Sequence, residues 1–185
     1  MTGASNVTGE IPPLGELVAA ARRAGTAVLV DAAQLAPHRR VSVRELDVDF
    51  LAVSGHKLYA PFGSGALVVR RDAVPARPPL LKGGGAVKAV ALDAVAWLEP
   101  PHLLEAGTPN VLGAVALGAA CEELARFGPD ELAREERLLA ERLWDGLAHI
   151  DGVRVLRLWD DADRVGVATF EVAGRDARAV AAELA

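Results

Sequence analysis

The sequence predicts an α/β fold in its first half, because short apolar runs that end abruptly at polar residues alternate with a helical pattern. Two of these runs stop at Asp31 and Ser54, which is typical of buried parallel strands that lead into loops. A third run follows the short turn 63–65, and so short a turn favours an antiparallel return. We expect strands at 26–30, 50–53 and 66–69. Together these segments predict a mainly parallel sheet with helices.

The segment 14–24 predicts the first helix. It places apolar residues at helical spacing, with two prolines at its entrance and Gly25 just past its end. From 74 to 109 the chain is rich in proline and glycine, so we expect a long irregular connection there.

The second half predicts a smaller α+β unit that begins with a pair of helices. We expect helices at 113–127, 129–149 and 176–184, and strands at 153–158 and 165–172. The pattern divides the chain into part of a large domain, 1–110, and a helical connection with an incomplete small α+β domain, 111–185. Because the last predicted helix runs to the final residue, we expect both ends to lie inside a longer fold.

The composition argues against several classes of function. The net charge is −5 at pH 7 and the arginines are interleaved with acids, so no basic surface for DNA or RNA is expected. The longest apolar stretches are far shorter than the roughly 18 to 20 residues that a membrane span needs. Cys121 is the only cysteine, which excludes an intrachain disulfide and favours a reducing compartment. We therefore expect a cytoplasmic protein, without a bound metal.

Asp31 and Lys57 are the most informative pair of residues. Each follows an apolar strand, and one crossover joins the two strands, so parallel pairing would place both at the same sheet edge. A carboxylate and an amine at one crevice suit a pyridine aldehyde cofactor, since the amine can form a Schiff base and the carboxylate can keep the ring nitrogen protonated. Taken singly, such an Asp is most often a helix cap or turn residue, and such a Lys a solvated charge.

The neighbouring residues connect this pair to a known family. The sequence resembles the class V branch of fold-type I pyridoxal-phosphate (PLP) enzymes in two segments, Val-Asp-Ala-Ala-Gln at 30–34 and Ser-Gly-His-Lys-Leu-Tyr-Ala-Pro-Phe-Gly-Ser-Gly at 54–65. The similarity is strongest to the cysteine desulfurase and selenocysteine lyase group. It continues through Ser-Asn-Val-Thr-Gly at 5–9 and Glu-Ala-Gly-Thr-Pro-Asn at 105–110, in the family's order.

The resemblance implies a role for several polar residues of the two central segments. Lys57 would form the Schiff base with PLP and move the substrate's alpha proton, and Asp31 would pair with the pyridine nitrogen. Gln34 is similar to the family's donor to the phenolic oxygen of the ring. Ser54 and His56 resemble its phosphate ligands, although a single histidine is more often a structural residue bonded to a carbonyl.

Two further residues match the family outside the segments 30–34 and 54–65. Asn6 matches the position near the substrate carboxylate or the cofactor ring, where the alternative is an Asn in a turn. Thr108 matches a threonine that reaches the phosphate of the other subunit, which implies a homodimer with shared sites; read alone, its segment is only a turn. The glycines at 83–85 have no strand-to-helix context, and we leave them out of the site.

The resemblance leaves three functions open. Complete family members are roughly twice this length, so the sequence does not choose between removing sulfur or selenium from a cysteine-type substrate and transferring its amino group. A truncated, non-catalytic remnant that retains the fold and the dimer surface is the second reading. A cofactor-free Schiff-base lysine of the aldolase kind is weaker, because Asp31, Gln34, Ser54 and His56 would then have no joint purpose.

Overall fold

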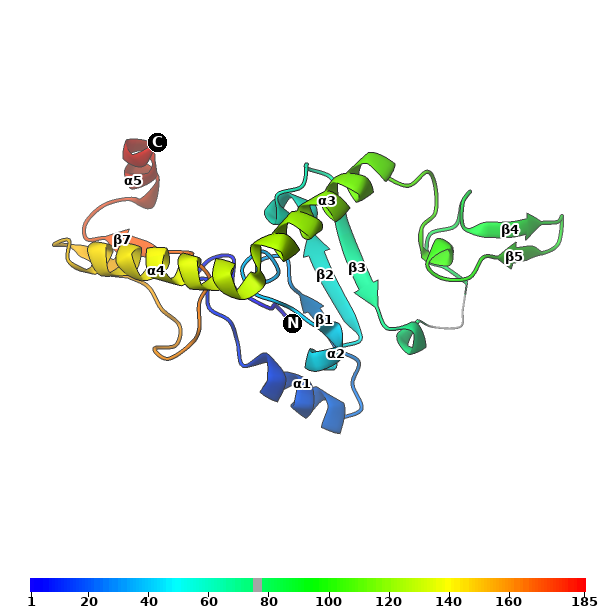
Figure 1. The fold of residues 1–185 in the computed structure, drawn as a ribbon, viewed down its shortest axis with the longest axis horizontal. Coiled ribbons are helices and arrows are strands. Elements are labelled where there is room, and N and C mark those ends of the chain that lie inside the picture. Colours follow the sequence, from blue (N-terminus) through cyan, green and yellow to red (C-terminus); the bar gives the residue numbers. More distant parts are fainter. Residues whose placement is uncertain (75–77) are drawn as a thin grey trace.

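The computed structural model describes residues 1–74 and 78–185. Its centre is a three-stranded sheet in the order β1-β2-β3 (Figure 1). The strands are β1 (Leu29–Asp31), β2 (Phe50–Ser54) and β3 (Gly65–Val69). β1 pairs with β2 in parallel and β3 returns antiparallel, as expected for each pair. The fold is therefore of the expected mixed α/β kind, and its sheet combines a parallel with an antiparallel pairing.

The first residues of the chain extend the sheet beyond β1. Thr2 forms a parallel bridge with Asp31, whose backbone N–H donates to the Met1 carbonyl at 2.9 Å and whose carbonyl accepts from Gly3 at 2.7 Å. Both main-chain groups of Asp31 thus bond to the segment 1–3, while Ala52 of β2 is its register partner on the other side.

The core packs one helix and several loops against this sheet. Helix α1 (Leu14–Arg23) buries Leu14 and Val18, two residues of the predicted apolar stripe. Val30 is fully buried at the centre of β1. The rest of the buried cluster comes from the loops and from β2, namely Ala4, Val28, Ala32, Leu35, Val48, Leu51 and Val165. A short helix, α2 (Val43–Leu46), which the sequence analysis did not predict, begins where the Ser42 hydroxyl accepts from the Glu45 N–H.

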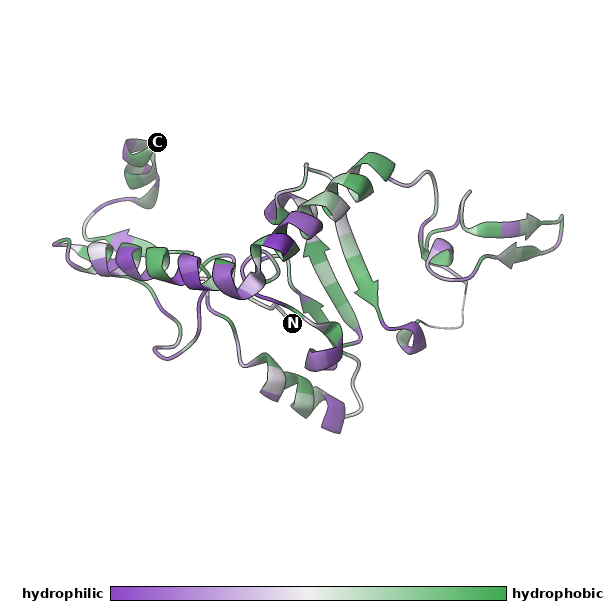
Figure 2. Ribbon diagram, viewed as in Figure 1, coloured by the Kyte–Doolittle hydropathy of each residue, from purple (hydrophilic) through white to green (hydrophobic). Residues whose placement is uncertain are grey.

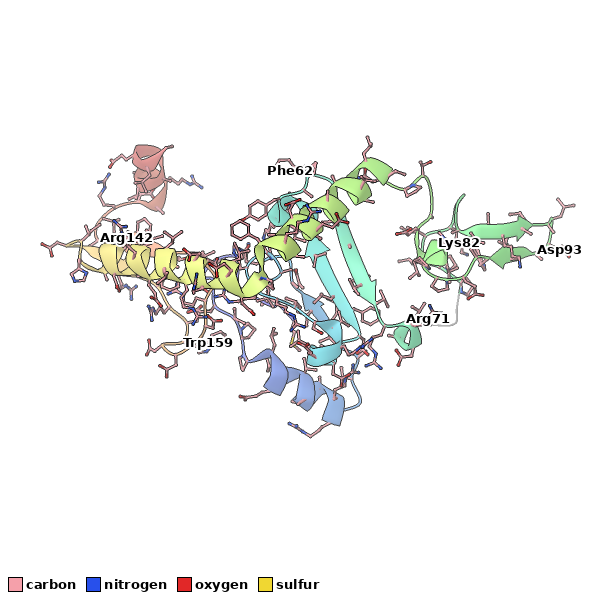
Figure 3. The ribbon with its side chains drawn as sticks, viewed as in Figure 1. Phe62, Arg71, Lys82, Asp93, Arg142 and Trp159 are labelled. Atoms are coloured by element: carbon pink, nitrogen blue, oxygen red, sulfur yellow. The ribbon has the colours of Figure 1, made fainter. Side chains whose placement is uncertain are left out.

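The expected irregular connection contains regular structure. Strands β4 (Val87–Val90) and β5 (Val95–Trp97) form a hairpin that projects from the rest of the molecule (Figure 1). The hairpin turns around Asp93, which lies at its tip (Figure 3). These strands were not expected because each is only three or four residues long, too short for a clear alternation of apolar and polar side chains. The 3₁₀ turn η3 (His102–Leu104) also lies in this region, whereas η1 (Gly55–Leu58) and η2 (Arg71–Ala73) precede it.

The predicted pair of helices at 113–127 and 129–149 is present. Helix α3 (Val111–Phe127) begins at Asn110, whose side chain accepts from the Gly113 N–H at 3.0 Å, and it ends at Gly128, which has a φ of +89°. Helix α4 (Pro129–Ala148) starts with a proline, the residue that suits a first helical position. α3 contacts β3 and η1 (Figure 1).

The strands of the second half are shorter than expected. They are β6 (Val153–Val155) and β7 (Phe170–Val172), which pair antiparallel, followed by helix α5 (Ala177–Leu184). Residues 165–169 were expected in a strand, but Val165 is instead fully buried in the core of the first half and donates its N–H to the Gly9 carbonyl at 2.9 Å. The division at residue 110 stays a prediction. Within the described residues, no helix has the length and apolar character needed to cross a membrane.

An ion pair of the first half generates a stability prediction. The Asp49 carboxylate is nearly buried and accepts from Arg22 at 2.9 Å and from the Val28 N–H at 2.7 Å. The Arg22 guanidinium, assisted by this N–H, lowers the pKa of Asp49. Because the folded state favours the ionised form, this contribution is present above the ordinary carboxyl pKa of about 3.9 and is lost as the pH falls below it.

We expect Asp49→Asn to lower the free energy of unfolding by about 1–3 kcal/mol at pH 7, measured by urea denaturation, because charged hydrogen bonds are lost. The difference from the unmodified chain should shrink below pH 4. The control is Asp72→Asn, which removes an exposed carboxylate paired with Arg70 and should change stability little. Equal effects of the two substitutions, or no dependence on pH, would contradict this account.

Candidate active site

The candidate site lies at the carboxyl ends of β1 and β2. Parallel register places Asp31 beside Ala52, and the next residue, Ala32, donates its N–H to the Ala52 carbonyl at 2.9 Å. The chain then leaves β2 at Ser54 and enters η1, which carries Lys57. The crossover between the two strands therefore returns Lys57 to the same edge of the sheet as Asp31.

Lys57 and Gln34 are joined directly. The Lys57 amine donates to the Gln34 Oε1 atom at 2.8 Å, and both residues are half-buried. Within residues 1–74 and 78–185, no carboxylate forms an ion pair with Lys57. A neutral acceptor thus fixes the direction of the amine.

The Asp31 carboxylate is exposed and is turned by its own loop. Its Oδ1 atom accepts from the Ala33 N–H at 3.0 Å, the usual contact of an Asp with the backbone two residues on. Its second oxygen has no hydrogen bond among the described residues. Asp31 and Lys57 share the edge without a hydrogen bond or ion pair between them there.

Ser54 and His56 form a second contact pair. The Ser54 hydroxyl lies 3.0 Å from the His56 Nδ1 atom, and the imidazole is stacked on Phe62, with 5.4 Å between ring centroids. Phe62 is almost fully exposed (Figure 3). The pair combines a hydroxyl and an imidazole, both of which can donate to an anion.

Asn6 and Thr108 lie outside these contacts. Both are exposed, and among the described residues neither side chain makes a hydrogen bond to Asp31, Gln34, Ser54, His56 or Lys57. Asn6 is in a turn, where the Ser5 hydroxyl accepts from the N–H groups of Val7 and Thr8. Gly107, beside Thr108, donates to the Gly84 carbonyl at 2.7 Å.

Asn110 links the site to α3, a role that was not predicted from the sequence. Its amide donates to the Gly63 carbonyl at 3.0 Å while its oxygen caps the helix, which ties α3 to the loop that follows Lys57. The only signal was an Asn directly before a helical pattern. Such an Asn predicts a helix cap, but it does not predict the hydrogen bond to the Gly63 carbonyl.

Comparison with known proteins identifies the family. The model of the family described as Aminotransferase class-V matches residues 1–185, the whole chain. The chain belongs to this family. It is 38% identical over 98% of its length to a probable cysteine desulfurase from Xylella fastidiosa (strain Temecula1), of which it covers 43%. The chain thus spans less than half of the length of the curated relatives that it matches.

Two solved structures are similar to this chain over nearly all of its length. The apo structure of a cysteine desulfurase from Thermococcus onnurineus superposes with a TM-score of 0.93 at 38% identity, covering 99% of this chain and 46% of that one. A C-DES mutant superposes with a TM-score of 0.86 at 28% identity, covering 99% and 49%, and holds glycine covalently linked to its PLP cofactor. A structural relative of this class V chain thus uses PLP.

The residues at this edge fit PLP by their chemistry. The Lys57 amine is bonded only to a neutral amide, the Asp31 carboxylate keeps one oxygen without a hydrogen bond among the described residues, and hydroxyl and imidazole groups lie next to the amine in sequence. These are the functional groups that a pyridine ring, an aldehyde and a phosphate require.

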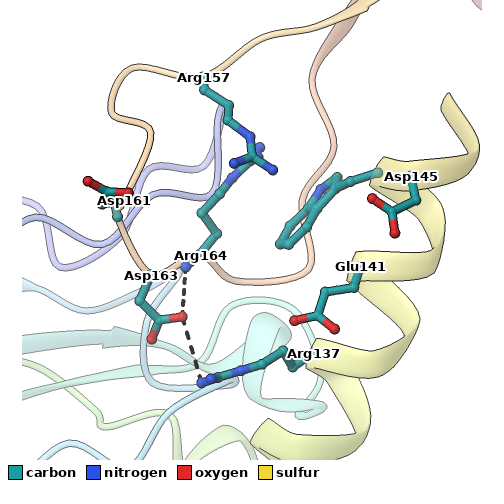
Figure 4. A pocket seen from close by; sticks show the side chains of 9 residues that line it. Arg137, Glu141, Asp145, Arg157, Asp161, Asp163 and Arg164 are labelled. Atoms are coloured by element: carbon teal, nitrogen blue, oxygen red, sulfur yellow. Dashed lines mark hydrogen bonds and ion pairs between the residues drawn. The ribbon is translucent and has the colours of Figure 1, made fainter. Parts of the chain in front are cut away.

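A separate cavity of about 570 Å³ lies between α4 and the loop 157–164 (Figure 4). The Arg164 guanidinium lies over the Trp144 ring at 4.4 Å, and burial together with the charge of Arg157 lowers the pKa of Arg164. Arginines and acids line this cavity without any lysine, and Asp163 accepts hydrogen bonds from Arg39. It cannot supply the amine that an aldehyde needs, so the site at the sheet edge remains the candidate.

The turn that carries Lys57 depends on the glycine at position 55. A Cβ atom at Gly55 would lie 2.0 Å from the Ser64 hydroxyl and 2.8 Å from its carbonyl, which itself accepts from the Gly55 N–H. We expect Gly55→Ala to lower the free energy of unfolding by about 1–3 kcal/mol, because backbone must move to admit the methyl group.

The control for this prediction is Gly118→Ala on the exposed side of α3, where a Cβ atom meets nothing within 4 Å. This change should stabilise the chain by about 0.5–1 kcal/mol through helix propensity. Urea denaturation measures both variants. An unchanged stability of Gly55→Ala would show that the turn tolerates a side chain.

Proposed function

We propose that this chain carries the lysine-bearing part of a PLP-dependent site that acts on an amino acid, of the cysteine desulfurase or selenocysteine lyase type. The observation that supports it most is the Lys57 amine held 2.8 Å from Gln34 Oε1 at the sheet edge that also carries Asp31. Membership of the class V family and the similarity to cysteine desulfurases support the same function.

Bound PLP would supply an electron sink for the bond that breaks at the substrate. Lys57 would hold the aldehyde carbon until the substrate amine displaces it, and its freed Nζ atom would then move a proton, while Asp31 would hold the proton of the ring nitrogen. Gln34 would donate from its amide to the oxygen on the ring. Ser54 and His56 would donate to the phosphate, where charge-assisted hydrogen bonds are strongest.

Asn6 and Thr108 have proposed roles at the edges of the site. Asn6 would donate its side-chain amide to the substrate carboxylate from its exposed turn. Thr108 would donate its hydroxyl to the phosphate bound by a second copy of the chain, which makes the functional unit a homodimer. Its exposure supports this role, as does the lack of a hydrogen bond to the Lys57 group among the described residues.

A second candidate is a non-catalytic protein that retains the fold and its interaction surface. The apolar residues Val111, Leu112 and Val115 of α3 are 58%, 85% and 68% exposed, and the helix is mostly apolar (Figure 2). Large exposed apolar surfaces indicate contacts with other polypeptide. This candidate requires no cofactor, so a direct test of PLP binding separates the two.

The test is covalent labelling of the purified chain. PLP is added, the yellow absorbance is recorded, the adduct is reduced with borohydride, and the modified peptide is identified by mass spectrometry. We expect one label, on Lys57, because it is the lysine that lies beside Gln34. Lys57→Ala should abolish the label and the absorbance.

The matched control is Lys88→Ala in β4, which removes another lysine of the chain and should leave the label unchanged. Labelling spread over Lys57, Lys82 and Lys88 would indicate unspecific reaction. Absence of any adduct would favour the non-catalytic candidate.

A further inference from the structure

A row of side chains leaves the candidate site and ends on α4. Gln34, whose oxygen accepts from Lys57, has its Nε2 atom 3.3 Å from the Nε2 atom of His38. The other ring nitrogen of His38, Nδ1, lies 2.6 Å from the Glu136 carboxylate. Lys57, Gln34, His38 and Glu136 thus form one continuous chain from η1 to α4.

The donors and acceptors of this chain agree only when His38 is neutral with its proton on Nδ1. The Glu136 carboxylate can only accept, so Nδ1 must donate to it. The Gln34 amide uses its oxygen for Lys57 and therefore presents an N–H group to His38, so Nε2 must accept. An imidazolium would place two donors against each other at this contact.

The surroundings of His38 favour the neutral ring. Burial lowers the pKa of His38, and the charges of Arg39 and Lys57 lower it further, whereas the Glu136 carboxylate acts in the opposite direction. These groups face the ring from its own loop, from η1 and from α4. The net direction is downward, so His38 is neutral at pH 7.

Glu136 is itself held in place. It accepts from Arg39 at 2.7 Å and from the Gly166 N–H at 2.8 Å, and its side chain is mostly buried. Arg39 also donates to the Arg164 carbonyl at 2.7 Å. The anchor of His38 is thereby fixed by groups from two separate segments of the chain, at residues 39 and 164–166.

We propose that His38 and Glu136 are a positioning pair that fixes the orientation of the Gln34 amide at the Lys57 site. With one N–H of Gln34 donated to His38 and the oxygen turned to Lys57, the second N–H is left for an acceptor in the site. This inference rests on the proposed function, in which that acceptor is the oxygen on the PLP ring. A flipped amide would instead direct its NH₂ group at the lysine amine.

The protonation state of His38 is measured without any cofactor. The chain is labelled with ¹⁵N-histidine, and ¹H–¹⁵N correlation spectra assign the proton to Nδ1 or Nε2; His38→Gln identifies the signals of His38 among those of the four histidines. We expect His38 to carry its proton on Nδ1 and to be neutral at pH 7, since its pKa lies below the ordinary histidine value of about 6.5. A proton on Nε2, or an imidazolium at pH 7, would overturn the proposal.

Gln34→Glu probes the contact between Gln34 and His38. A carboxylate cannot donate to Nε2, so His38 should gain a second proton at pH 7 in this variant. Gln34→Leu, which removes the donor without adding charge, should leave the ring neutral. An unprotonated His38 in Gln34→Glu would show that Gln34 does not face the ring, and would also overturn the proposal.

The affinity for PLP measures how much the contact between His38 and Gln34 contributes to the site. His38→Phe removes the acceptor, and we expect PLP to bind roughly tenfold more weakly, the equivalent of one hydrogen bond, while labelling still occurs at Lys57. His38→Gln, whose amide oxygen can accept the same bond, should restore most of the affinity. Equal affinity in all three proteins would overturn the positioning role. If the unmodified chain forms no adduct, the proposed function fails, while the histidine spectra still decide the amide orientation.

Discussion

The parallel pairing of β1 with β2 is the constraint on which the site depends. It places residue 31 and the turn that follows residue 54 on one edge, although the loop 32–49 separates them in the sequence. The pairing is held on both sides, by the segment 1–3 at β1 and by β3 at β2. Antiparallel pairing of the same two strands would have sent the lysine to the opposite edge of the sheet.

Hydrophobic patterning predicted the central sheet and the long helices because these elements bury continuous apolar runs or stripes. α1 and α4 begin and end within one or two residues of the expected positions, with Pro and Gly at their boundaries. The hairpin β4-β5 and the true extent of β6 and β7 were not predictable in this way. Val165 illustrates the reason, since an apolar residue buried in a distant core has the same signal as one in a strand.

Only those residues of the candidate site that lie in short sequence motifs were predicted. Asp31 and Lys57 lie on one edge as the strand pattern predicted, and the contact between Gln34 and Lys57 follows from that edge. His38 and Glu136 carried no recognisable signal, because the two lie far apart in the sequence and each resembles an ordinary surface residue. The roles of Asn6 and Thr108 rest on resemblance alone.

Val165 also affects the order in which the molecule can form. The cluster around Val30 is incomplete until this residue arrives, and the adjacent Arg164 donates to the Thr8 carbonyl with most of its side chain hidden from water. During synthesis, the core around the sheet therefore stays incomplete until a segment more than a hundred residues further along the chain has been made. Contacts between such distant parts of a chain slow folding, and a partly formed core exposes apolar surface until they form.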